Sequence, residues 1–294
     1  MHDPHALPGD DLVVDGVRLH VVRHGRDGHQ GEPPLLMLHG LGTTGRLWSD
    51  VARDLERGHR SIVPDLAGCG RSERPDRRRC APTAQAELML ALLSELQHER
   101  AVVVGHDAGG AVAVHIAALA PERVSALVLT GSPLHDDVWP PPMALPLRVP
   151  VLGSVFGGLL RYAGPATARV VTGLAGSTAG GSGPPAGELA AYAAALAGPE
   201  AGRGLRDFVE SFDASAVQAA LEVVAAAAPP TLVLWGEEDR RLPVTYGARV
   251  AAALPGATWV PIAGAGHLLP TERPERVAEE IAGFLADVAA PVSG

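Results

Sequence analysis

The chain has 294 residues, of which 47% are hydrophobic and 19% charged, and its net charge is −9 at pH 7. This length and apolar content suit one large α/β core with an insertion, and a negative charge without a basic run argues against nucleic acid or an anionic membrane surface as a partner. No stretch of about 18 or more apolar residues indicates a membrane span, and residues 1–11 lack the charged start and apolar run of an export signal, so we expect a cytoplasmic protein.

Strands and helices alternate over the first part of the chain. Residues 12–24 predict two strands about a turn at Asp15-Gly16, and short buried strands are predicted at 35–38, 61–63, 101–104 and 124–130. Helices are predicted after Thr44, over 83–97 with Thr83 as N-cap, and over 111–120. This alternation is typical of a mostly parallel, doubly wound sheet.

The strand rhythm stops at about residue 134 and resumes at about 229. An insertion of roughly ninety residues is too long for a plain connection, so we predict a helical lid after the sixth strand. Beyond it the pattern predicts strands at 231–235 and 258–262, a helix at 246–254, and a closing helix from Thr271 or Glu272 to 289. The predicted division is a core over 1–133 and 229–294, with the lid over 134–228.

The run G-H-D-A-G-G, Gly105 to Gly110, lies between a buried strand and a helix. A nucleophile elbow requires this context, with small residues two before and two after its central residue, as Gly105 and Gly109 are around Asp107. A carboxylate needs no base to become a nucleophile, but its ester with a carbonyl substrate would be an anhydride, so displacement at a saturated carbon suits it better. A turn aspartate at a helix N-terminus is the structural alternative.

Two further residues stand just past predicted strands. Asp239 and His267 follow Asp107 in the order nucleophile, acid, histidine that marks one family of catalytic triads. Glu237, Glu238 and Asp136 are alternative acids. His106 neighbours the nucleophile and must point away from it, which favours a structural role.

These motifs resemble the α/β-hydrolase fold family, in particular its aspartate-nucleophile branch of epoxide hydrolases and haloalkane dehalogenases. The matching pieces are His39-Gly40, Asp65 with Gly68, Gly70 and Ser72, the elbow, the loop Gly236 to Pro243, and Gly266-His267. The fold that the resemblance implies is an α/β-hydrolase fold with an inserted helical lid.

The resemblance also implies roles for residues outside the triad. The N–H groups of Leu41 and Ala108 would form an oxyanion hole, and the lid tyrosines Tyr162 and Tyr192 would act as ring-opening acids, with packing as their alternative role. His39 and Trp139 would contact substrate, although Trp139 could simply pack. No metal or cofactor is implied, and the expected partner is a small apolar substrate, with a homodimer as an option.

The predicted activity is hydrolysis of an epoxide to a vicinal diol through an ester on Asp107. A dehalogenase is the first alternative, although Ala108 and Ala111 stand where dehalogenases place a tryptophan or an arginine pair. The turn His39-Gly40-Leu41-Gly42 in turn lacks the proline of epoxide hydrolases. A non-hydrolytic biosynthetic enzyme and a ligand-binding protein with this fold are further alternatives.

Three minor expectations complete the sequence reading. Cys69 and Cys80 are expected to be reduced thiols. Trp235 and Trp259 lie in predicted strands and are expected in the core. A basic cluster is expected to be a solvated face; its members are Arg71, Arg74 and Arg77 to Arg79.

Overall fold

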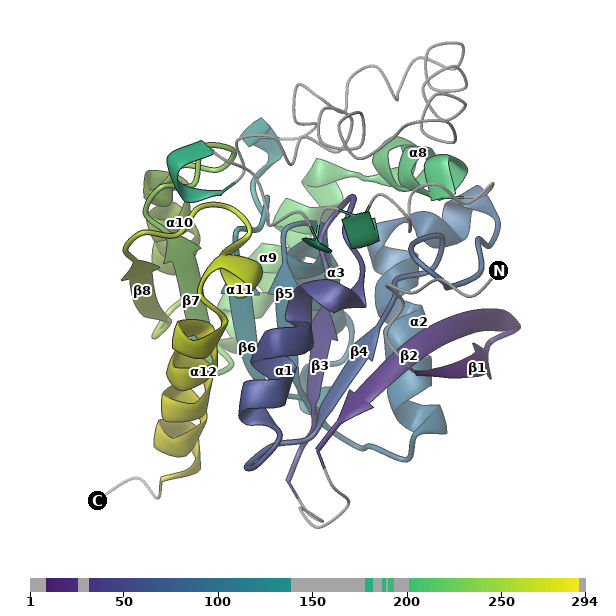
Figure 1. The fold of residues 1–294 in the computed structure, drawn as a ribbon, viewed down its shortest axis with the longest axis horizontal. Helices are drawn as coiled ribbons and strands as arrows, with labels where there is room; N and C mark the ends of the chain where they lie inside the picture. Colours follow the sequence, from purple (N-terminus) through teal and green to yellow (C-terminus); the bar gives the residue numbers. More distant parts are fainter. Residues whose placement is uncertain are drawn as a thin grey trace.

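The computed structural model describes residues 9–25, 32–138, 178–181, 187–188, 190–192 and 201–290. In this part of the chain, eight strands form one sheet in the order β1-β2-β4-β3-β5-β6-β7-β8 (Figure 1). The two pairings of β2, with β1 and with β4, are antiparallel, and all other neighbours are parallel. The strands are β1 Asp10–Val14, β2 Val17–His24, β3 Leu35–Leu38, β4 Ser61–Pro64, β5 Ala101–His106, β6 Val124–Thr130, β7 Thr231–Gly236 and β8 Thr258–Ile262.

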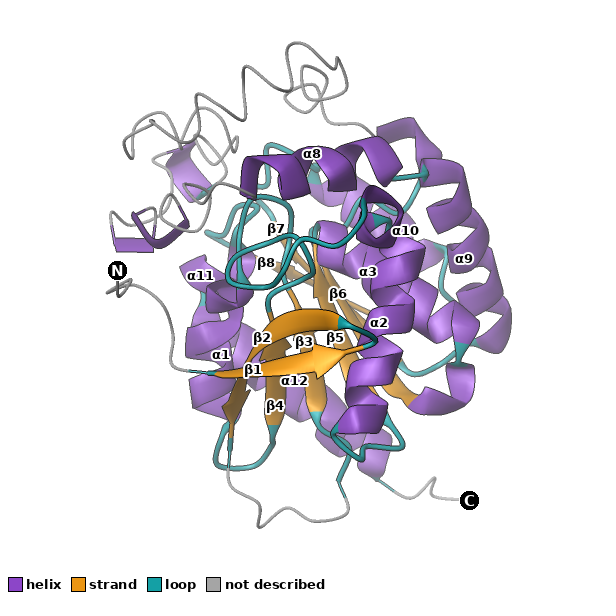
Figure 2. Ribbon diagram, turned by 90° about the vertical axis from the view of Figure 1, so that its right-hand side faces the viewer, coloured by secondary structure: helices purple, strands orange, loops and turns teal. Residues whose placement is uncertain are grey.

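Helices cover both faces of this sheet, as Figure 2 shows. One layer consists of α1 Ser49–Leu55, α11 Leu269–Glu272 and α12 Pro274–Ala289; the other consists of α2 Pro82–Glu95, α3 Ala108–Leu119, α9 Ala214–Ala227 and α10 Val244–Ala252. The described part of the chain also contains α8 Ala201–Ser211 and the short 3-10 turns η1 Gly45–Trp48, η2 Arg77–Cys80, η3 Pro121–Arg123, η4 Asp136–Val138 and η6 Ala179–Gly181. The mostly parallel, doubly wound sheet predicted from the sequence is confirmed.

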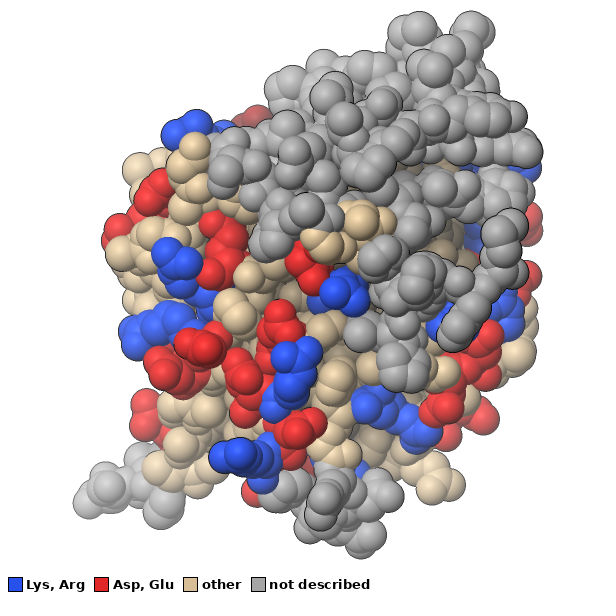
Figure 3. Space-filling view, in the orientation of Figure 1, with Lys and Arg blue, Asp and Glu red and all other residues tan. Residues whose placement is uncertain are grey.

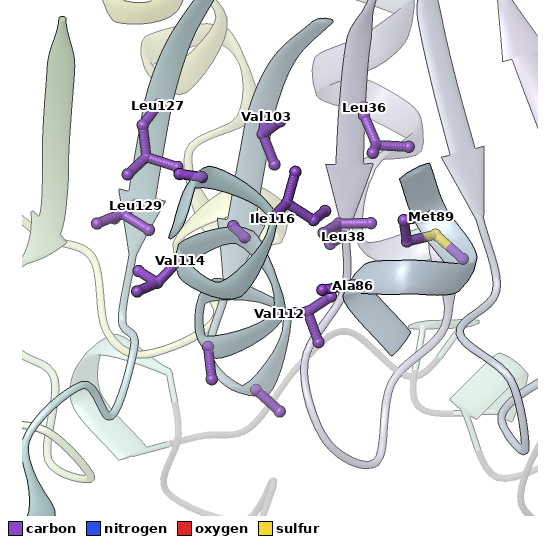
Figure 4. Packing of buried hydrophobic residues seen from close by; sticks show 14 of the residues in the cluster. Leu36, Leu38, Ala86, Met89, Val103, Val112, Val114, Ile116, Leu127 and Leu129 are labelled. Carbon is purple, nitrogen blue, oxygen red and sulfur yellow. The ribbon is translucent and has the colours of Figure 1, made fainter. Parts of the chain in front are cut away.

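Alternate residues of the central strands fill the core on opposite faces of the sheet. On the face shown in Figure 4, strand residues pack against helices α2 and α3; the side chains are Leu36, Leu38, Val103, Leu127 and Leu129 from the strands and Ala86, Met89, Val112, Val114 and Ile116 from the helices. The intervening strand residues, such as Met37 and Val104, pack against α1 and α12. Each large apolar side chain so buried contributes about 1.5–3 kcal/mol.

Local sequence explains most element boundaries. Asp15 and Gly16 both have positive φ, at 47° and 75°, which closes the predicted hairpin between β1 and β2. The hydroxyl of Thr44 accepts a hydrogen bond from the N–H of Arg46, so Thr44 caps η1 as predicted. The prediction of Thr83 as a cap is wrong, because α2 begins at Pro82, whose fixed φ suits the first turn of a helix.

The closing helix is interrupted where the sequence predicts one continuous element. The first piece, α11, ends at Glu272, Arg273 leaves the helical conformation, and α12 begins at Pro274. A proline cannot donate to the preceding turn and disfavours a helical residue before it, which accounts for the break.

Helices α8 and α9 lie in the range that the sequence assigns to the lid. Helix α9 packs on α3 and contributes Val217, Leu221 and Val224 to the same core cluster, so it extends a helix layer of the sheet. Helix α8 packs against η2 and also approaches the loop after β4, where a Cβ at Gly204 would lie 1.9 Å from the carbonyl oxygen of Gly68. The division at residues 134 and 228 stays a prediction.

Part of the arginine cluster docks α8 onto the core. The guanidinium of Arg74 donates to Asp207, which is 1% exposed, at 2.7 Å, and Arg77 pairs with Glu210 at 3.0 Å. The expectation of a solvated face is therefore wrong for Arg74. On the face formed by α1 and α12, basic and acidic side chains are intermixed (Figure 3). Among the described helices, none has the length and apolar character of a membrane span.

Candidate active site

The strand order reverses between β3 and β5, and both strands end at the same edge of the sheet. Loops after the carboxyl ends of parallel strands form a crevice at such a switch point. His39 to Leu41 follow β3, and Asp107 follows β5. This topology brings the predicted oxyanion loop beside the predicted nucleophile.

Asp107 has a strained backbone between β5 and α3, with φ 49° and ψ −120°. Such a conformation is costly for a residue with a side chain and is typical of a nucleophile elbow. The flanking glycines are required by contact, because a Cβ at Gly105 would lie 2.6 Å from the carbonyl oxygen of Gly109, and a Cβ at Gly109 would lie 2.4 Å from that of Leu38. The sequence therefore folds into the predicted strand, tight turn and helix.

The carboxylate of Asp107 is held against the loop after β3. Its Oδ2 accepts the backbone N–H of Leu41 at 3.0 Å, and a Cβ on Gly40 would lie 2.7 Å from the Asp107 Cβ. Leu41 thus holds the position expected of an oxyanion-hole donor. The second expected donor, the N–H of Ala108, begins α3 directly after Asp107 and stays a prediction.

His267 faces Asp107 and is oriented by Asp239. Its Nδ1 lies 2.8 Å from Oδ2 of Asp239, and its Nε2 lies 3.9 Å from Oδ1 of Asp107. Because a carboxylate only accepts, Nδ1 carries the proton and Nε2 presents a lone pair. Within the described residues Nε2 has no hydrogen-bond partner, so it is free to act as a base toward a molecule between the two side chains.

Asp239 is itself fixed by the turn after β7. Its Oδ1 accepts the N–H groups of Arg241 and Leu242 at 2.8 and 2.9 Å, which leaves Oδ2 for the imidazole. The alternative acid Asp136 is exposed on η4, where its own N–H donates to Gln218. The geometry therefore pairs His267 with Asp239.

His39 is fully buried and braces the loop that carries Leu41. Its Nε2 accepts the N–H of Leu66 at 3.0 Å, and its Nδ1 donates to the carbonyl oxygen of Gly40 at 2.9 Å. Burial lowers the pKa of this imidazole, which keeps it neutral as these bonds require. Both ring nitrogens are used, so the predicted substrate contact of His39, which stays a prediction, could involve only its ring carbons.

The loop after β4 is held by a buried carboxylate. Asp65 accepts the N–H groups of Gly45 and Arg71 at 2.8 and 2.9 Å, and its carbonyl oxygen accepts the Ser72 hydroxyl. A Cβ at Gly70 would lie 2.2 Å from Oδ2 of Asp65. The Asp65 motif noted in the sequence therefore fixes loops around the site.

The structure covers only part of the predicted set of lid residues. Tyr162 and Trp139 lie outside the described residues. Tyr192 is fully buried in the core cluster that contains α1 and α11. Burial and the nearby Glu188 raise the pKa of its phenol, and Thr271 and Arg46 act on it in the opposite direction. Its predicted role as an acid stays a prediction.

Two further residues contribute at this edge of the sheet: His106, for which the sequence favours a structural role, and Glu272, whose contact here sequence reasoning missed. His106 is buried, and its ring centroid lies 5.0 Å from that of His267. Its Nδ1 lies 2.9 Å from the Thr130 hydroxyl, so His106 is held in place and packs against the His267 ring. Glu272 accepts the N–H of Gly266, the residue before His267, at 3.0 Å. A carboxylate five positions after the histidine was the only local signal for this contact.

The described residues offer no metal site, because they contain no group of three or more His, Cys, Asp or Glu side chains that could hold an ion. Cys69 and Cys80 are free thiols, and burial raises the pKa of both, to about 12 for Cys80.

Comparison with known proteins agrees with the fold seen in the structure. Residues 33–274 match the family model described as the alpha/beta hydrolase fold. The uncharacterized hydrolase YugF of Bacillus subtilis is 27% identical over 276 residues, covering 93% of this chain and 96% of its own.

Solved structures show the same similarity. The haloalkane dehalogenase DbeA from Bradyrhizobium elkani superposes with a TM-score of 0.78 at 25% identity, covering 95% of this chain and 97% of its own. The epoxide hydrolase CorEH superposes with a TM-score of 0.79 at 20% identity over 96% of this chain and 99% of its own.

Proposed function

Because this chain belongs to the alpha/beta hydrolase fold family and has the fold of a hydrolase, we propose that it hydrolyses an epoxide to a vicinal diol through an ester formed on Asp107. The supporting observation is the geometry of that carboxylate. Its Oδ2 is bound by the N–H of Leu41, while its Oδ1 lies 3.9 Å from the free Nε2 of His267. One oxygen is thereby stabilised and the other is left to react.

In the first step, a lone pair on Oδ1 of Asp107 attacks a saturated epoxide carbon. The C–O bond of the strained ring breaks as the new ester bond forms, and a lid tyrosine, Tyr162 or Tyr192, gives its proton to the departing oxygen. A phenol remains protonated at neutral pH and can make this donation. Apolar residues of the insertion suit an apolar substrate.

In the second step, His267 removes a proton from a water molecule that attacks the Cγ of Asp107. Negative charge then develops on Oδ2, where the N–H of Leu41 stabilises it. The Cγ–Oδ1 bond breaks, the departing oxygen takes the proton from His267, and the diol leaves with Oδ1. Asp239 keeps the imidazole in the required tautomer and offsets its charge while it is protonated.

Dehalogenation is the second candidate, supported by the 25% identical dehalogenase structure and by the same carboxylate geometry. It would use the same nucleophile and the same hydrolytic step, with a halide as leaving group. The departures at Ala108 and Ala111 place it second, because neither residue offers a side-chain donor for a halide.

A single turnover in water enriched in heavy oxygen tests both candidates. Enzyme in excess is mixed with each member of a panel of epoxides and haloalkanes, and the mass of the peptide containing Asp107 is measured by mass spectrometry. We expect one heavy oxygen in that carboxylate after turnover, with diol from epoxides. Heavy oxygen only in the product would contradict the ester, and free halide without diol would favour the dehalogenase. The Asp107→Ala variant is the control and should acquire no label.

A further inference from the structure

Glu272 makes two backbone contacts that join distant parts of the chain. Its Oε2 accepts the N–H of Gly266 at 3.0 Å and the N–H of Ala179 at 2.7 Å. Gly266 directly precedes His267, whereas Ala179 belongs to η6 in the insertion, 93 residues away from Glu272 along the chain. One carboxylate oxygen therefore connects the histidine loop to the insertion.

Glu272 is partly buried, as are both of these hydrogen bonds. Its Oε1 is buried and has no hydrogen-bond partner among the described residues, and Thr178, which precedes Ala179 in the insertion, is 4% exposed. Burial raises the pKa of this carboxyl, and the two N–H bonds oppose that change. Two N–H donors from distant segments thus converge on one oxygen of this partly buried carboxylate.

A second contact holds the same segment of the insertion without contacting the backbone before His267. Glu238, an exposed residue of the loop that carries Asp239, accepts the N–H of Gly180 at 3.0 Å. Glu238 thus holds the same short segment of the insertion, residues 178–181, but its side chain does not bond the backbone before His267. It is the matched control for any effect of loosening the segment alone.

We propose that Glu272 is a positioning residue of the active site, which couples residues 178–181 of the insertion to the placement of the His267 imidazole. When the segment is seated, Ala179 and Gly266 share one acceptor, and the backbone before His267 is fixed. Without the Ala179 N–H, the Glu272 carboxylate is fixed by one donor fewer and restrains Gly266 less, and small displacements of a catalytic base reduce its efficiency strongly. The kinetic consequence rests on the proposed function, because it assumes that His267 is the base of the second step.

Amide hydrogen exchange, measured by residue-resolved NMR, tests the coupling without any substrate. Glu272→Gln keeps the reach and an acceptor oxygen, whereas Glu272→Asp keeps the charge but is one methylene too short to span both donors. We expect exchange at Gly266 and Ala179 together to be about tenfold or more faster in Glu272→Asp, and near wild type in Glu272→Gln. In Glu238→Asp, which shortens the side chain in the same way, only Gly180 and its neighbours should exchange faster.

A substitution at Ala179 tests the same contact if the Glu272 variants fail to fold. Ala179→Pro removes the donating N–H at the first position of η6, where proline is tolerated, and leaves Glu272 intact. It should also speed exchange at Gly266. Unchanged exchange at Gly266 in both Glu272→Asp and Ala179→Pro would overturn the proposal. So would a rise at Gly266 in Glu238→Asp that equals the rise in Glu272→Asp.

Rapid-quench kinetics then connect the coupling to the reaction. In Glu272→Asp, decay of the Asp107 ester should slow about tenfold or more while its formation changes less than about threefold, because only the second step needs His267. Equal slowing of both steps would overturn the assignment. Should wild type form no ester at all, the proposed function fails, and the exchange experiment still decides the role of Glu272.

Discussion

The Nε2 atom of His267 lies 3.9 Å from Oδ1 of Asp107, beyond hydrogen-bond distance and on the side of the imidazole opposite Asp239. A direct His–nucleophile bond, which a serine would need in order to lose its proton, is therefore not made. The arrangement suits a base that acts on a water molecule near Asp107 and leaves the carboxylate itself to attack unaided.

Substitution of His267 by glutamine should separate the two steps of the reaction. The first step needs only Asp107, so the ester should form, whereas its hydrolysis should slow by about 10²- to 10⁴-fold without the base. Intact-protein mass spectrometry after mixing with substrate should show one equivalent of adduct that persists. The doubly substituted Asp107→Ala, His267→Gln protein should show no adduct; an adduct there, or rapid decay in the single variant, would contradict the scheme.

Asp239→Asn should lower turnover by about 10²- to 10⁴-fold through the tautomer of His267. The amide oxygen would accept the N–H groups of Arg241 and Leu242, so its NH2 group would face the imidazole Nδ1. Nδ1 must then accept, and Nε2 carries the proton and can no longer act as a base. Steady-state kinetics against Asp136→Asn, at the exposed alternative acid, provide the comparison. A larger loss in Asp136→Asn would reverse the assignment.

Gly40→Ala should damage the oxyanion loop rather than the triad. The added Cβ would lie 2.7 Å from the Cβ and 2.9 Å from Oδ2 of Asp107, so the loop must shift and Leu41 loses its hydrogen bond. We expect turnover to fall by about 10²- to 10³-fold, the usual loss for one oxyanion donor. Gly58→Ala is the matched control because no atom lies within 4 Å of its added Cβ. Equal effects in the two variants would exclude the steric argument.

The meeting of Asp107, Asp239 and His267 could be predicted because each residue has a local signature. Asp107, Asp239 and His267 all follow short apolar strands, and the handedness and order of parallel strands bring such positions to one edge of the sheet. The hairpin at Asp15-Gly16 and the Thr44 cap were predictable for the same reason, since both are decided within a few residues.

Contacts between distant segments left no such signature. The sequence around Arg74 indicates only a solvated basic cluster, since its buried partner Asp207 lies 133 residues further along the chain. The sequence around Glu272 indicates only the start of a helix, since its partner Ala179 lies 93 residues earlier. The packing of α9 on α3 likewise depends on how the chain returns from the insertion to the sheet. Local patterns could not predict any of these pairings.

The ring-opening acid can be assigned by phenylalanine substitutions at the two lid tyrosines. Tyr192 is fully buried in the core cluster that contains α1 and α11, where a substrate cannot reach its phenol, so we expect the larger loss of epoxide turnover, about 10²-fold or more, in Tyr162→Phe. The rate of ester formation from epoxides should fall, and ester hydrolysis should not change. Unchanged formation in the double variant would exclude both phenols as acids, and a larger loss in Tyr192→Phe would reverse the assignment.

Buried histidines should make the protein less stable in mild acid. Burial, and next the neighbouring His267, lower the pKa of His106 well below its usual range, and burial lowers that of His39. Below a pH of about 6.5, these rings bind protons in the unfolded chain but not in the folded chain. The free energy of unfolding should therefore decrease as the pH is lowered, by up to about 1.4 kcal/mol per pH unit for each histidine. The loss ends once the pH passes below the folded-state pKa.

Urea denaturation at several values between pH 7.5 and pH 5.0 measures this slope, and His106→Asn tests its origin. Asparagine can still bond the Thr130 hydroxyl but does not titrate, so the variant should lose stability at pH 7.5 and lose less than wild type on acidification. Glu272, whose raised pKa gives a contribution of opposite sign, is common to both proteins and cancels in the difference. Parallel curves for the two proteins would mean that His106 does not titrate differently in the folded and unfolded states.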